Sequence, residues 1–211
     1  MQRIVGLTIW GIAFGYMEAA VVVYLRALYY PEGFAFPLKT MPQSVLLTEI
    51  GRETATLIIM AATAMLASRR RQQRVAAFFF LFGIWDIFYY LFLKLLLDWP
   101  SSLDTWDILF LIPLPWAGPV WAPSLVASAF VLLTLPILLA KHPYRFGRWF
   151  LLLETVAALL IVTSFILPGC SGIDRHQPDF FPWPMFWSGF LLGTGTFMAV
   201  LYRGKRGEKG E

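Results

Sequence analysis

Six long apolar runs constrain the fold of this chain more than any other feature. They cover approximately residues 4–30, 44–68, 75–98, 119–140, 144–167 and 184–203. Each run is long enough to cross a bilayer as a helix. Charged residues make up 14% of the chain, whereas soluble domains carry about 25%. The sequence therefore predicts an all-α, polytopic membrane bundle of six transmembrane helices. This bundle forms a single domain over residues 1–203, and we expect residues 204–211 to be a disordered tail.

Basic residues gather in the connections on one side of the predicted bundle. Twelve of them precede the first run, lie at or after the end of the sixth, or flank the connections between the second and third and between the fourth and fifth runs. Only Lys39 and Arg175 fall in the opposite connections. This bias predicts that both termini are cytoplasmic. Short basic clusters beside apolar runs are orientation signals, so the net charge of +4 does not indicate nucleic-acid binding. The lipid bilayer is the expected partner.

Ionisable side chains inside the apolar runs are the candidates for function, because each costs about 2.5–3.5 kcal/mol at the bilayer centre. Eight are present, with a formal charge of −2: Glu18, Arg26, Glu49, Arg52, Glu53, Asp86, Lys94 and Glu154. We expect Arg26 or Lys94 near Glu49, and Arg52 near Glu18 or Asp86. The two remaining acids are then either protonated or hold a cation. Oxygen ligands favour a hard cation, and no cofactor is predicted.

The predicted ligand-binding site comprises six residues, with Arg26 and Lys94 as their charge partners: Glu18, Glu49, Arg52, Glu53, Asp86 and Tyr90. Glu49 and Glu53 share one helix face, because residues four apart in a helix are neighbours. We expect a net-acidic cavity open to the extracytoplasmic side, which binds or transports a cation, a proton or a small polar molecule. Two alternatives stay open. One is an intramembrane enzyme acting on a lipid-like substrate through a carboxylate and Tyr90. The other is a structural subunit of an oligomer or larger membrane complex.

A repeated pattern relates the first and third runs. Phe14-Gly15-x2-Glu18-x7-Arg26 and Phe82-Gly83-x2-Asp86-x7-Lys94 match at an offset of 68 residues, and a second step reaches Phe150 and Glu154. The pattern is consistent with three repeated helical hairpins, or with chance among hairpins of equal length. If the fifth helix begins at Arg148 rather than Tyr144, Glu154 lies near the cytoplasmic surface.

The connection at residues 99–118 is apolar but too short to span. Its prolines, Pro113 and Pro115, prevent a regular helix, so we expect residues 106–117 to be re-entrant or interfacial. The acids of this connection are predicted to form a solvated loop rather than a metal site: Asp98, Asp104 and Asp107. A plain loop is also expected around Asp174, His176 and Asp179.

Residues 18–38, 83–94 and 106–116 resemble a family of bacterial multi-pass inner-membrane proteins with no assigned function. The quoted stretches include EAAVVVYLRALYYPEGFAFPL and GIWDIFYYLFLK. The resemblance implies a bacterial inner-membrane protein and carries no activity with it.

Overall fold

The computed structural model describes residues 1–39, 41–171, 176 and 178–207. Within them lie six helices, all long and apolar enough to cross a membrane. They are α1 (Gln2–Tyr29), α2 (Gln43–Ala67), α3 (Arg71–Leu97), α4 (Trp121–Leu139), α5 (Arg148–Gly169) and α6 (Trp183–Gly207). The predicted six-helix bundle is confirmed. The protein is a multi-pass helical membrane protein by the length and composition of these spans.

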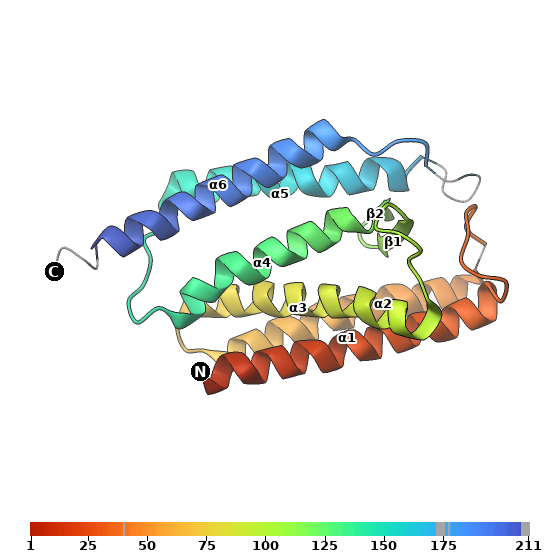
Figure 1. Cartoon of the computed structure of the whole chain (residues 1–211), viewed down its shortest axis with the longest axis horizontal. Coiled ribbons are helices and arrows are strands. Elements are labelled where there is room, and N and C mark those ends of the chain that lie inside the picture. The colour runs from red at the N-terminus through yellow and green to blue at the C-terminus, as the bar shows by residue number, and fades with distance from the viewer. Residues whose placement is uncertain (40, 172–175, 177, 208–211) are drawn as a thin grey trace.

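The helices form three layers (Figure 1). Helices α1, α2 and α3 lie on one side, α5 and α6 lie on the other, and α4 runs between them. Helix α3 is central because it packs against α1, α2 and α4, whereas α5 and α6 pack mainly on each other. The start of α1 and the end of α6 lie toward the same end of the bundle (Figure 1).

Glycines permit the close approach of α3 to its neighbours. A Cβ on Gly15 of α1 would lie 2.9 Å from the carbonyl oxygen of Trp85. A Cβ on Gly83 of α3 would lie 2.5 Å from the carbonyl oxygen of Ala127 on α4. Small residues are the usual means of bringing helix backbones together in lipid. The apolar core beneath these contacts includes Met60 and Leu81, both fully buried.

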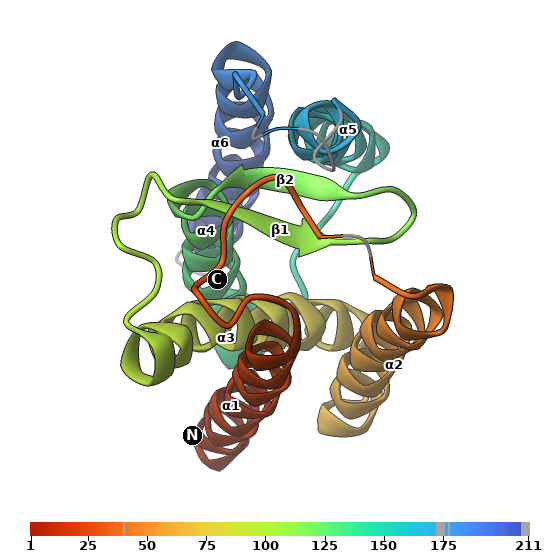
Figure 2. The ribbon, with the colours of Figure 1, turned by 90° about the vertical axis from the view of Figure 1, so that its right-hand side faces the viewer.

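A β-hairpin crosses the end of the bundle opposite the termini (Figure 2). Its strands are β1 (Trp106–Phe110) and β2 (Trp116–Pro119), paired antiparallel with Asp107 opposite Gly118. The segment at residues 106–117 is thus a hairpin, and its re-entrant or interfacial position relative to the lipid stays a prediction. The prolines do exclude a helix there, but strand pairing satisfies the backbone polar groups instead. Strand β2 packs on α5, so the hairpin joins the two sides of the bundle.

Two predicted boundaries move in the structure. Helix α5 begins at Arg148, not near Tyr144, after a connection that contains Pro143 and Gly147. Helix α6 continues to Gly207, so part of the predicted tail is helical. Residues 208–211 lie outside the described part of the chain.

Candidate functional site: a buried polar network beneath the hairpin

Arg52 links α1 to α2 through two carboxylates. Its Nε donates to Glu49 Oε2 at 2.8 Å, one turn away on the same helix. Its Nη1 forms an ion pair with Glu18 on α1, as predicted. The Thr56 hydroxyl also donates to Glu18, at 3.5 Å. The two carboxylates are about one-tenth exposed and Arg52 is 23% exposed, so this bridge is largely buried.

Glu53 anchors the hairpin to α2. The main-chain N–H of Leu111 donates to both carboxylate oxygens of Glu53, at 2.9 and 3.1 Å. Leu111 follows β1 directly, so this contact fixes the turn of the hairpin onto α2. Glu53 is buried. The sequence singled out this acid, but its partner lies 58 residues later and carries no side-chain signal.

Asp107 is the site residue that sequence reasoning missed. It was expected in a solvated loop, yet it is 3% exposed, because β1 turns its side chain into the bundle. Arg26 Nη2 lies 3.7 Å from its Oδ1, and the Tyr90 hydroxyl donates to its Oδ2 at 3.2 Å. Burial raises the pKa of Asp107 to about 6, with Arg26 opposing the rise. The run of aromatic and β-branched residues from Trp106 to Phe110 was the available signal for a strand.

Arg26 therefore pairs with Asp107, not with Glu49. Its guanidinium lies 3.7 Å from the ring centre of Trp99 and 4.7 Å from that of Phe34. Stacking of this kind suits a guanidinium that is removed from water. The expected contact with Glu49 fails because Arg52, on the same helix as Glu49, already occupies that carboxylate.

Asp86 carries the unsatisfied group of the network. It is 8% exposed, and its Oδ2 has no hydrogen-bond partner among the described residues. Asp107 is close enough to interact with it electrostatically. Asp86 lies 11 residues before the end of α3, which places it roughly 16 Å inside the span. Nearly all buried polar groups in proteins are paired, so this oxygen is unusual.

Lys94 is not part of the buried network, contrary to its predicted role as a charge partner. Its Nζ lies 2.7 Å from Asp98 Oδ1 in an exposed pair at the end of α3. It also donates to the carbonyl oxygen of Pro100 at 3.2 Å. A lysine in the last turn reaches outward to water and to the terminal carbonyls, which explains the difference.

Glu154 is also separate from the network, on the other side of the bundle. It accepts a hydrogen bond from the Thr196 hydroxyl of α6. Because α5 begins at Arg148, Glu154 lies two turns from the start of its helix, near the chain termini. In the connection between α5 and α6, Asp174 lies outside the described part of the chain, and Cys170 is an exposed free thiol.

Negative groups outnumber positive ones at this site. It gathers five carboxyl groups and two guanidinium groups: Glu18, Glu49, Glu53, Asp86, Asp107, Arg26 and Arg52. Their formal charge is −3 when all are ionised. The carboxyl groups are spread over separate contacts, and no three His, Cys, Asp or Glu side chains of the described residues converge as metal ligands. The arrangement is suited to binding a proton or a cation at one carboxylate, and not to holding a metal ion between several carboxylates.

Together, the spans and this network define a multi-pass membrane protein with a buried acidic site near one end. Comparisons with protein-family models, with curated proteins and with solved structures found no match.

Proposed function

We propose that this is a bacterial inner-membrane protein that binds a monovalent cation or a proton at Asp86, and that this binding is a step in the transport of that ion across the membrane. The observation that carries the proposal is the buried carboxylate oxygen of Asp86, which has no partner among the described residues. Ionising a group in that setting is costly unless positive charge arrives with it. A proton, or a small or organic monovalent cation, would supply that charge.

Orientation is part of the same proposal. The end of the bundle that carries both termini also carries the clusters that contain Arg69, Arg145 and Arg148. By the positive-inside bias, that end is cytoplasmic. The hairpin and Asp86 then lie toward the extracytoplasmic side, from which the cation or a small polar molecule would enter.

The same contacts bear on two alternatives to cation binding. A purely structural subunit of a larger complex needs every buried charge paired, and the free oxygen of Asp86 does not fit that requirement. An intramembrane enzyme is favoured by one observation, the hydrogen bond between Tyr90 and Asp107, which couples a phenol to a carboxylate. Such a pair can exchange protons with a substrate. It is the second candidate function.

Cation binding can be tested by thermal unfolding of the full chain in detergent. NaCl, KCl and tetramethylammonium chloride are titrated at constant ionic strength, balanced with N-methylglucamine, and a parallel series varies pH. We expect one cation, or the proton, to raise the unfolding temperature with saturation, because a ligand at 100 times its Kd stabilises by about 2.7 kcal/mol.

Asp86→Asn is expected to abolish that rise, and to be more stable than the wild type without ligand, because no charge is then buried. Glu154→Gln is the matched control, since it neutralises an acid of the opposite side, and it should keep the rise. A saturable rise with a metal or organic cation that persists in Asp86→Asn would overturn the proposal. So would the absence of a rise with any cation together with a pH series in which Asp86→Asn and the wild type change by the same amount. Flux of the stabilising cation into proteoliposomes then separates transport from binding alone.

A further inference from the structure

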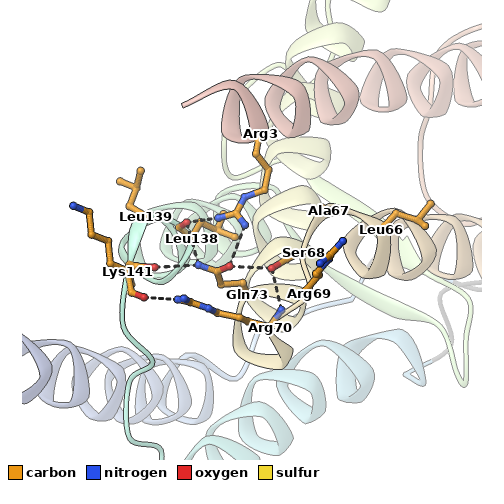
Figure 3. Close-up of a pocket in the computed structure, with 11 residues that line it drawn as sticks. Arg3, Leu66, Ala67, Ser68, Arg69, Arg70, Gln73, Leu138, Leu139 and Lys141 are labelled. Atoms are coloured by element: carbon orange, nitrogen blue, oxygen red, sulfur yellow. Dashed lines mark hydrogen bonds between the residues drawn. The ribbon is translucent and has the colours of Figure 1, made fainter.

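A second polar site lies at the opposite end of the molecule, where the chain termini are. A pocket of about 700 Å³ opens between the start of α1, the α2–α3 connection and the end of α4 (Figure 3). It shares no residue with the network around Asp86, so an occupant here would use none of the residues of the proposed cation site.

The floor of this pocket is built by Gln73, which is 9% exposed. Its amide nitrogen donates to the carbonyl oxygens of Ala140 at 3.2 Å and Ile137 at 3.3 Å. Its amide oxygen accepts from Arg3 Nη1 at 3.0 Å and from the Ser68 hydroxyl at 2.9 Å. Figure 3 shows these groups as one connected network. The floor is therefore fixed, and Arg3 is held by it.

Four cations surround the pocket: Arg3, Arg69, Arg70 and Lys141. None of them forms an ion pair with an acid of the described residues. Arg70 Nη1 is tied to the carbonyl oxygen of Lys141 at 2.5 Å. The side chains of Arg69 and Lys141 are exposed and make no hydrogen bond within the described part of the chain. The pocket thus presents uncompensated positive charge on a rigid floor, which is suited to an anion.

The rim of the pocket is apolar where it meets the lipid. Leu66 is 89% exposed and Leu139 is 56% exposed, and both lie in the last turn of a membrane span. Ends of spans lie at the level of the lipid headgroups on either side of the membrane. An occupant with an anionic phosphate and an acyl chain would satisfy both parts of the pocket, whereas free phosphate would leave the leucines uncovered.

We propose that this pocket binds the headgroup of an anionic phospholipid. The phosphate lies among Arg69, Arg70 and Lys141, and an acyl chain follows Leu66 and Leu139 into the bilayer. Basic pockets between transmembrane helices are suited to such headgroups because charge attraction and chain burial act together.

The test is native mass spectrometry of the delipidated full chain in detergent micelles, with phosphatidylglycerol or phosphatidylcholine added at equal concentration. The variant Arg69→Gln/Lys141→Gln removes two charges that make no hydrogen bond or ion pair within the described part of the protein. The matched control is Arg145→Gln/Arg148→Gln, which removes two exposed charges at the same end but outside the pocket.

We expect the wild type to retain phosphatidylglycerol over phosphatidylcholine. The pocket variant should bind phosphatidylglycerol about thirty-fold more weakly, and the control should stay within about threefold of the wild type. Equal retention of both lipids would overturn the proposal, as would equal losses in the two double variants. Inorganic phosphate is added as a competitor; if it displaces the lipid at equal concentration, the site takes soluble phosphate and the lipid proposal fails.

Discussion

The two sides of this bundle hold their helices together by different means. On one side, α1 and α2 both pack on α3 and are joined to each other through Arg52 and Glu18. On the other, α5 and α6 meet without an ion pair among the described residues: a Cβ on Gly189 would lie 2.8 Å from the carbonyl oxygen of Ala157, and the Thr196 hydroxyl donates to Glu154. Close packing suffices for a helix pair in lipid. The charges of the first side therefore exceed what assembly alone demands, which is why we look there for function.

Of the substitutions that test this difference between the two sides, Arg52→Gln should lower the free energy of unfolding most. In Arg52→Gln the carboxylates of Glu18 and Glu49 lose their shared cation, and breaking a buried pair from one side costs about 3 kcal/mol or more. The measurement is denaturant-induced unfolding in detergent micelles. Arg145→Gln, an exposed arginine, is the control. If the two variants unfold alike, the bridge does not hold α1 to α2.

The hairpin should also give the stability of the protein a pH dependence, because it carries the buried acid Asp107. Burial raises the pKa of Asp107 from 3.8 to about 6. The folded protein then binds a proton that the unfolded chain has lost, so its stability is greatest below about pH 4 and falls as pH rises through 6. The fall amounts to at most about 3 kcal/mol.

Unfolding of Asp107→Asn between about pH 4 and pH 7 should show a smaller fall than the wild type. Asp104→Asn, which changes an exposed acid of the same connection, should keep the wild-type slope. The slope is compared and not the absolute stability, since Asp107→Asn also takes a partner from Arg26. A slope unchanged from the wild type would show that Asp107 is ionised at no cost.

The packed side should respond to volume instead of charge. Gly189→Ala places a methyl group against the backbone of α5, and overpacking of this kind costs about 1–3 kcal/mol. Gly195→Ala lies on the same helix with nothing within 4 Å, so it should leave the unfolding temperature unchanged or raise it slightly. Equal behaviour of the two alanine variants would contradict the close contact between α5 and α6.

Lys94→Gln should have the smallest effect on stability. Its pair with Asp98 is exposed at the end of α3, so water and salt screen it. Lys94→Gln should leave the unfolding temperature of the purified protein where it is. A clear drop would place Lys94 in the buried network after all, as the sequence alone suggests.

The sequence predicts what depends on local pattern and misses what depends on distant pairing. The six spans follow from apolar runs, and the burial of Glu18, Glu49 and Asp86 follows from their positions inside those runs. The i, i+3 spacing of Glu49 and Arg52 was also a local signal, but we expected Arg26 or Lys94 beside Glu49 instead. By contrast, Asp107 enters the site only because β1 pairs with β2. The prolines between these two strands indicated an irregular segment and gave no sign of that pairing.

The Arg52 bridge also bears on the order in which the chain enters the bilayer. An unpaired charge in a span costs about 2.5–3.5 kcal/mol during insertion. Arg52, Glu18 and Glu49 all belong to the first two helices, so the leading helical hairpin brings its own compensation as it leaves the ribosome. Asp86 has no such companion within its own helix pair. The hairpin that later covers Asp86 brings a second acid, Asp107, and no positive charge of its own, so the span that contains Asp86 enters the bilayer at lowest cost with the Asp86 carboxyl protonated.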